Sequence, residues 1–267
     1  MPILHLLILA LIQGVTEFLP ISSSGHLALY PLLTGAPDQG LKLDVATHIG
    51  TLAAVLVYFR MEAGMAIRGG IRLLGLDFRS REAKLALHLI VATIPAVIVG
   101  ALLSAFHITE SFRSLAVIGW ATIIGALFLW AADRWGGLSR GWEEWGMRHA
   151  ILTGLAQVVA LIPGMSRSGM TIAAARALGY GRVDAARVSL LMSIPVTFAA
   201  GVLITAEVVS SGDSSLQADV VVAAILSFLA AYGAIWIFMR MLRTQTMTVF
   251  VIYRLILGPI LLWLAYS

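Results

Sequence analysis

The sequence predicts an all-α polytopic membrane protein with six transmembrane helices, two re-entrant helical hairpins and an inverted-topology repeat. Of its 267 residues, 60% are hydrophobic and only 12% are charged, whereas an average soluble domain carries about 25% charged residues. Such a chain cannot cover its surface with polar groups, so we expect lipid around it. No segment rich in Ser, Pro or charge divides the chain, which favours a single membrane domain over residues 1–267.

Six apolar segments are long enough to be transmembrane helices, because a helix needs about 20 residues to cross the hydrocarbon core. They cover residues 43–59, 86–106, 112–132, 187–207, 218–239 and 248–265. Pro95 and Pro195 fall inside two of them. Neighbouring helices can satisfy the backbone groups that a proline frees, so both segments still qualify.

Two further apolar stretches are interrupted by polar residues and do not fit as simple spans. Residues 3–33 contain Glu17 and a serine-rich run, and residues 149–178 contain Arg167 within a similar run. Broken backbone at membrane depth survives only where protein or a water-filled cavity satisfies its polar groups. We therefore predict that both stretches are re-entrant hairpins, which enter the membrane and return to the same side.

The distribution of basic residues predicts the orientation. With both termini outside, the inner loops are residues 60–84, 133–148, 176–187 and 240–247. These loops carry 14 of the 18 Lys and Arg residues, and the outer loops carry two, Lys42 and Arg113. Loops rich in Lys and Arg remain on the cytoplasmic side of the membrane. The first hairpin then enters from outside and the second from the cytoplasm, so the halves 1–132 and 133–267 have opposite orientations.

A weak internal similarity supports this duplication. Gly14-x-x-Glu17 in the first hairpin resembles Gly154-x-x-Gln157 in the second, and each is followed by a proline and a Ser-x-Ser-Gly motif. Inverted repeats whose broken helices meet at mid-membrane are typical of secondary transporters. A carrier function is therefore one interpretation of this layout.

Composition excludes several kinds of site. The chain contains no cysteine, which removes disulfides, thiolate nucleophiles and zinc–sulfur sites. Its net charge of +4 comes from basic residues in short loops between apolar segments. We attribute this charge to membrane orientation and expect a lipid bilayer, not nucleic acid, as the partner.

The first hairpin gathers polar groups at its break. Gln13 and Glu17 are four residues apart and share one face of a helix. Pro20 ends that helix, and a new helix beginning near Ser24 would direct free backbone N–H groups and the hydroxyls from Ser22 onward toward an anion. A carboxylate in the bilayer core costs at least about 2.5 kcal/mol. Glu17 is therefore a functional candidate.

The same hairpin has the residue types of an activated serine. Ser23 lies in the turn, and His26 falls on the first turn of the second helix. A serine hydroxyl is a poor nucleophile until an adjacent base takes its proton, and a histidine oriented by a carboxylate commonly does so. We predict that Ser23 and His26 form a nucleophile–base pair and that Glu17 lies beside them.

The second hairpin has the residue types of an anion clamp. Arg167 lies between Ser166 and Ser168 in a glycine-rich turn, and Thr171 follows one helical turn later. A guanidinium can hold a phosphate through two parallel hydrogen bonds, and small flanking residues bring further donors close. If the two hairpins meet, Glu17 and Arg167 share one pocket.

Three other ionisable residues have structural interpretations. His48 and His88 lie near the ends of predicted spans, and we interpret them as packing or interfacial residues. Arg254 lies inside the last apolar segment and needs an acidic or carbonyl partner there.

At these motifs the sequence resembles the undecaprenyl-diphosphate phosphatase family, also called bacitracin resistance proteins, over nearly the whole chain. The resemblance rests on three motifs: Gln13-x-x-x-Glu17-Phe18-Leu19-Pro20-Ile21-Ser22-Ser23-Ser24-Gly25-His26, Pro163-Gly164-Met165-Ser166-Arg167-Ser168-Gly169-x-Thr171 and Phe250-Val251-Ile252-Tyr253-Arg254. It implies a hydrolase of the bacterial inner membrane that converts undecaprenyl diphosphate to undecaprenyl phosphate and inorganic phosphate. That reaction recycles the lipid carrier for cell-wall synthesis and confers bacitracin resistance.

The resemblance also implies roles for single residues. It assigns catalysis to Glu17, Ser23, His26 and Arg167, and substrate binding to Gln13, Ser22, Ser24, Ser166, Ser168 and Thr171. It implies a site that faces the periplasm and a divalent cation, Mg²⁺ or Ca²⁺, with Glu17 and Gln13 as metal ligands. Many family members have Glu where this chain has Gln13, and a neutral amide is a poorer magnesium ligand than a carboxylate.

The sequence leaves several alternatives open. Ser23 attacks the terminal phosphorus, or His26 activates a water molecule, or His26 itself takes the phosphoryl group. The rival function is a secondary transporter or flippase of an anionic lipid phosphate, which needs no nucleophile and base. The oligomeric state is also open, a homodimer included.

Overall fold

The computed structural model describes residues 3–35, 40–112, 114–210 and 214–267, and every regular element within these ranges is helical. The elements are α1 (Ile3–Thr16), α2 (Ser23–Thr34), α3 (Gly40–Tyr58), α4 (Arg60–Leu74), α5 (Arg81–Ala105), α6 (Ile108–Ser111), α7 (Leu115–Trp135), η1 (Trp142–Glu144), α8 (Met147–Val159), α9 (Arg167–Ala177), α10 (Arg182–Ser210), α11 (Ser214–Met241) and α12 (Thr248–Tyr266). Arg113, which the orientation argument counts with the outer loops, lies outside the described residues.

Four of the described helices are long and apolar enough to cross a membrane. They are Arg81–Ala105 of α5, Leu115–Trp135 of α7, Asp219–Met241 of α11 and Thr248–Tyr266 of α12. They coincide with the predicted spans 86–106, 112–132, 218–239 and 248–265. The predicted span 187–207 falls on α10, whose side chains from residue 200 onward lie outside the described set.

The predicted span 43–59 falls on α3, but the chain does not continue into a simple loop. It bends by 99° after Tyr58 and forms α4, so the expectation of a loop over residues 60–84 is wrong for residues 60–74. Gly69 lets α4 contact α5, because a Cβ atom there would lie 1.9 Å from the carbonyl oxygen of Glu82. The segment mixes basic, apolar and glycine residues, which hides its helical character in a search for uniformly apolar spans.

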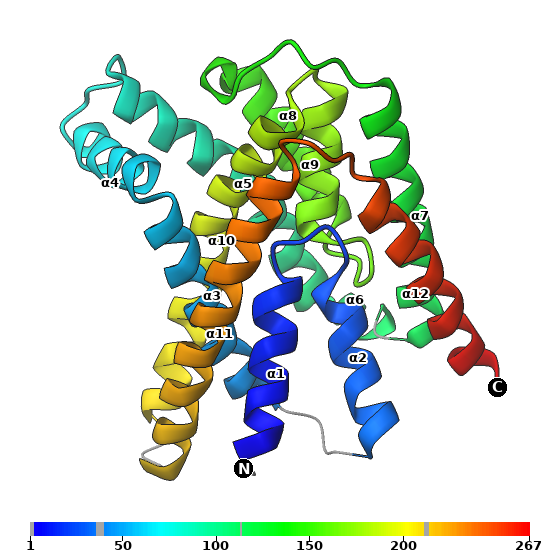
Figure 1. Ribbon diagram of the computed structural model, residues 1–267. Coiled ribbons are helices and arrows are strands. Elements are labelled where there is room, and N and C mark those ends of the chain that lie inside the picture. Colours follow the sequence, from blue (N-terminus) through cyan, green and yellow to red (C-terminus); the bar gives the residue numbers. More distant parts are fainter. Residues whose placement is uncertain (1–2, 36–39, 113, 211–213) are drawn as a thin grey trace.

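The two broken stretches form hairpins. In the first, α1 ends at Thr16 and α2 begins at Ser23; in the second, α8 ends at Val159 and α9 begins at Arg167. Each break contains a proline, which cannot continue the preceding helix. In Figure 1 the turn between α1 and α2 and the turn between α8 and α9 approach each other near the middle of the bundle.

The weak internal similarity has a physical basis in how the hairpins pack. The helix α1 packs against α11 at Gly14, where a Cβ atom would lie 2.6 Å from the Cβ of Ala230. The helix α8 packs against α5 at Gly154, where a Cβ atom would lie 2.5 Å from the carbonyl oxygen of Ala92. Both glycines therefore allow the first helix of a hairpin to approach a long helix of the other half closely.

Candidate active site

The turns of the two hairpins are built alike. Ser22 directly precedes α2 and Ser166 directly precedes α9, and both have a positive φ, 72° and 67°. Residues other than glycine rarely adopt this conformation, which costs about 1 kcal/mol or more. The Ser166 hydroxyl also accepts a hydrogen bond from the Gly169 N–H at 3.2 Å and caps α9. Each turn thus reverses sharply and starts a new helix where the hairpins meet.

Two hydrogen bonds join the turns directly. The Gly164 N–H donates to the Ser24 hydroxyl at 3.1 Å, and the Ser168 hydroxyl donates to the Leu19 carbonyl at 3.0 Å. These bonds satisfy polar groups at the breaks that lipid could not satisfy. The two hairpins therefore support each other.

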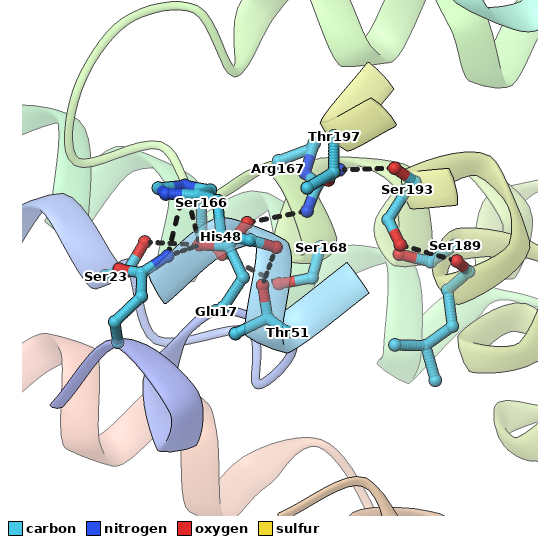
Figure 2. A network of polar contacts seen from close by, with 12 residues as sticks. Glu17, Ser23, His48, Thr51, Ser166, Arg167, Ser168, Ser189, Ser193 and Thr197 are labelled. Atoms are coloured by element: carbon cyan, nitrogen blue, oxygen red, sulfur yellow. Dashed lines mark hydrogen bonds and ion pairs between the residues drawn. The ribbon is translucent and has the colours of Figure 1, made fainter. Parts of the chain in front are cut away.

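An ion pair between Glu17 and Arg167 lies at the centre of this contact. Glu17 Oε1 accepts from Arg167 Nη2 at 2.7 Å, and the two side chains are 9% and 18% exposed. The second carboxylate oxygen, Oε2, accepts from the Ser23 hydroxyl at 3.0 Å and from Gln13 Nε2 at 2.8 Å. Figure 2 labels Glu17, Ser23 and Arg167 within this network of polar contacts. The expectation that the two charged residues share one pocket is confirmed.

The remaining donors of Arg167 lie near α10. Its Nη1 is 3.5 Å from the Ser193 carbonyl oxygen and 3.4 Å from the Thr197 hydroxyl. These distances are at the upper limit for hydrogen bonds. The guanidinium is therefore held firmly on one side by the carboxylate and weakly on the other. An incoming anion could compete for the weakly held donor.

A cavity of about 310 Å³ lies between the hairpins. Its walls are formed by Glu17, Ser22, Ser23, Ser24, His48, residues 160–164, Ser166 and Arg167. A larger cavity of about 450 Å³ between α7, α8 and α9 is lined by alanine, aromatic and other uncharged residues and carries no ionisable side chain. Only the smaller of these two has the charges and hydroxyls that phosphate chemistry requires.

His26 does not contact Ser23 in the described hydrogen bonds. Its Nδ1 lies 2.8 Å from the Ser22 carbonyl oxygen, and its Nε2 lies 2.5 Å from the hydroxyl of Tyr253. The two rings are stacked, with centroids 5.5 Å apart. Both ring nitrogens of His26 are thus engaged away from the carboxylate, and its role as a base stays a prediction.

His48 takes the place beside the carboxylate instead. Its Nε2 lies 3.8 Å from Glu17 Oε2 and 3.1 Å from Gln13 Nε2, and its side chain is 32% exposed. The interpretation of His48 as a packing or interfacial residue did not include this contact with the polar centre of the site. Its distance of 35 residues from Gln13 in the chain explains the omission, since no local pattern joins the two positions.

The residues predicted to bind substrate divide into two groups. Ser22, Ser24 and Ser166 line the cavity, whereas Gln13, Ser168 and Thr171 are not part of its lining. The Thr171 hydroxyl donates to the Arg167 carbonyl at 2.9 Å and lies 2.6 Å from the Ser189 hydroxyl. Thr171 therefore fixes the first turn of α9 against α10 and positions Arg167.

Arg254 holds the two turns together from α12. This fully buried guanidinium donates to the carbonyl oxygens of Pro20 at 3.4 Å, Gly164 at 2.9 Å, Met165 at 3.0 Å and Thr122 at 3.1 Å. The expected carbonyl partners are confirmed. One side chain thus links the first turn, the second turn and α7.

Comparisons with known proteins show the family to which the chain belongs. The model of the family described as bacitracin resistance protein BacA matches residues 6–260. The chain belongs to this family. Three curated relatives, each named undecaprenyl-diphosphatase, align over the full length of both chains. They come from Jannaschia sp. (strain CCS1), Ruegeria sp. (strain TM1040) and Alteromonas mediterranea, and are 52%, 50% and 45% identical.

Membership of the bacitracin resistance protein BacA family agrees with the sequence-based resemblance. The family match includes all three motifs on which the resemblance rests. In this chain those motifs supply the two turns and the guanidinium of Arg254 that joins them. The family signature therefore coincides with the structural centre of the molecule.

Proposed function

We propose that the protein hydrolyses undecaprenyl diphosphate to undecaprenyl phosphate and inorganic phosphate. The observation that carries this proposal is the Glu17–Arg167 ion pair, 2.7 Å long, beside the Ser23 hydroxyl in one cavity. Relatives named undecaprenyl-diphosphatase over their full length support the same substrate. Recycling this lipid would serve cell-wall synthesis and bacitracin resistance.

In the proposed mechanism, Arg167 and the hydroxyls and N–H groups of both turns hold the diphosphate. The Ser23 oxygen attacks the terminal phosphorus, the bond from that phosphorus to the bridging oxygen breaks, and the lipid leaves as its monophosphate. Glu17 takes the Ser23 proton, because its Oε2 already accepts that hydrogen bond at 3.0 Å. Water then hydrolyses the phosphoserine and releases inorganic phosphate. Arg167 stabilises charge on the transferring group.

The two His26 routes are the alternatives to a serine nucleophile. In one, His26 activates water; in the other, it accepts the phosphoryl group. Both would require His26 Nε2 to leave the Tyr253 hydroxyl, whereas the contact of Nδ1 with the Ser22 carbonyl could stay, because it places the free lone pair on Nε2. Both predict that Ser23→Ala retains turnover, whereas the serine route predicts its loss.

We also propose a divalent cation, Mg²⁺ or Ca²⁺, at Glu17 and Gln13. The ligand types fit, because Gln13 Oε1 is buried and has no hydrogen-bond partner among the described residues. The amide nitrogen of the same side chain lies 2.8 Å from the Glu17 carboxylate. When bound, the cation would neutralise charge on the diphosphate oxygens. Glu17 and Gln13 would hold it, while Arg167 holds the anion.

The proposed membrane placement follows the distribution of basic residues. We place the protein in the bacterial inner membrane with six spans, two re-entrant hairpins and the site toward the periplasm. The halves 1–132 and 133–267 would be inverted repeats, and the matching packing of α1 on α11 and α8 on α5 supports this. The isoprenoid tail would lie between spans in the outer leaflet. A homodimer stays a prediction, which native mass spectrometry in detergent would test.

Phosphate release by the purified protein tests the function. The substrates are C15 and C55 prenyl diphosphates, each assayed with and without EDTA. We expect one inorganic phosphate per prenyl diphosphate, loss of activity in EDTA and recovery after a divalent cation is returned. Transport of the intact diphosphate into liposomes without phosphate release would contradict hydrolysis and favour the carrier function.

A further inference from the structure

Three side chains with metal-ligating atoms converge at the edge of the cavity, and one of them is a residue that the motifs do not include. Gln13 Nε2 lies 2.8 Å from Glu17 Oε2 and 3.1 Å from His48 Nε2, and Glu17 Oε2 lies 3.8 Å from His48 Nε2. These three atoms form a triangle with edges of 2.8, 3.1 and 3.8 Å. Ligands at right angles around a cation, with bonds of about 2.1 Å, are about 3 Å apart.

The amide of Gln13 supplies a second, independent observation. Its side chain is 1% exposed, and its Oε1 has no hydrogen-bond partner in the part of the chain that the structure describes. A buried amide oxygen without a partner costs about 1–3 kcal/mol. A half-turn of the amide would place Oε1 where Nε2 now lies, between Glu17 and His48. Without a cation three electron-rich atoms would repel one another there, whereas a cation would bind all three.

Arg167 and Ser23 leave room for a cation at the carboxylate, because Arg167 binds the other oxygen and the Ser23 hydroxyl uses one of the two lone pairs of Oε2. Arg167 occupies Glu17 Oε1, not the Oε2 atom that faces Gln13 and His48. His48 and Glu17 both line the cavity, so a cation here would have open positions toward a bound phosphate. No three His, Cys, Asp or Glu side chains form a metal cluster among the described residues. The Gln13 amide is therefore needed to complete the set.

We propose that His48 is the third protein ligand of the divalent cation, together with Gln13 and Glu17. This inference rests on the proposed function, since it refines the cation site of the same reaction. Mg²⁺ and Ca²⁺ prefer ligand sets made of oxygen atoms, whereas an imidazole suits first-row transition metals better. A set of one carboxylate, one amide oxygen and one imidazole therefore disfavours Ca²⁺ among the proposed ions and makes Mn²⁺, which binds both oxygen and imidazole ligands, a suitable probe.

The test measures binding of Mn²⁺ alone to the EDTA-stripped protein in detergent, without lipid substrate. Electron paramagnetic resonance reports bound Mn²⁺, and electron spin-echo modulation detects a ¹⁴N nucleus coordinated to it. We expect an imidazole ¹⁴N signal in the wild type and competition by Ca²⁺ only at large excess. His48→Gln should remove the signal and weaken binding about tenfold or more. The control His107→Gln changes an exposed histidine and should preserve both.

Each outcome decides the proposal. Wild-type protein that binds Mn²⁺ without an imidazole ¹⁴N signal, or that binds no Mn²⁺ at all, overturns the ligand assignment. So does a ¹⁴N signal that persists in His48→Gln. The wild-type spectrum alone settles the question if the variant fails to fold. Phosphate release without the signal refutes only the His48 ligand, whereas the signal without phosphate release refutes only the proposed function.

Discussion

The hydrogen bond from Ser23 to Glu17 Oε2, 3.0 Å long, predicts that the two residues act as one unit. In the proposed mechanism neither works without the other, because the hydroxyl needs a proton acceptor and Ser23 is the hydroxyl that donates to this carboxylate among the described residues. Loss of general-base assistance costs about 10²–10⁴-fold in rate. At about 1.36 kcal/mol per tenfold, this is about 2.7–5.4 kcal/mol of transition-state stabilisation.

The variants Ser23→Ala, Glu17→Gln and the double variant measure this coupling. We expect each single variant to lose about 10²–10⁴-fold in kcat. The double variant should lose no more than the more impaired of the two single variants. Independent residues would instead multiply their losses to about 10⁴–10⁸-fold. Glu17→Gln also leaves Arg167 without a counter-charge, so its KM is expected to change in addition.

The assay is phosphate release from a C15 prenyl diphosphate at saturating substrate, with thermal unfolding as a check on folding. The matched control is Ser139→Ala, an exposed serine in the loop after α7, which should retain wild-type turnover. Losses that multiply in the double variant would refute the role of Glu17 as the base for Ser23. Near wild-type turnover in Ser23→Ala would refute the serine nucleophile itself.

Three further variants test other parts of the structure. Gly125→Ala should lower the unfolding temperature and abolish activity, because its Cβ would lie 2.3 Å from Arg254 Nη2, whereas Gly70→Ala, with no atom within 4 Å of its Cβ, should do neither. Arg167→Lys keeps the charge but loses the planar donor set, so KM should rise about tenfold or more, equal to about 1.4 kcal/mol. Burial raises the pKa of Tyr180 from 10 to about 12. As the pH rises, Tyr180 loses its proton in the unfolded chain before it does so in the folded protein. Its contribution to the free energy of unfolding is therefore fully present below pH 10 and decreases toward pH 12, so Tyr180→Phe should show a smaller decrease in thermal stability over that range.

The sequence predicted the centre of the site because the cost of burying charge is visible in a sequence. Glu17 and Arg167 stand out as ions within apolar stretches, and an ion in lipid needs a partner. Pro20 and Pro163 mark the breaks for a similarly local reason. The meeting of the hairpins followed from these residues and from the distribution of basic loops.

The positions that the sequence did not predict depend on contacts between distant segments. His48 belongs to the site only because α3 lies beside α1, and nothing near position 48 signals this. His26 was expected beside Ser23 on the basis of spacing, but Tyr253 from α12 engages its Nε2 instead. The helix α4 was missed because its glycines and arginines do not form a uniformly apolar run.

The position of Arg254 has a consequence for biosynthesis. The guanidinium that binds the Pro20 carbonyl lies 234 residues further along the chain, in the last helix. The first turn is therefore among the earliest parts to leave the ribosome, but it obtains this support only when translation is almost finished. A nascent chain would remain inactive until its final segment inserts. A protein truncated before α12 would retain Glu17, Ser23 and Arg167 but would lack the guanidinium that holds the two turns together.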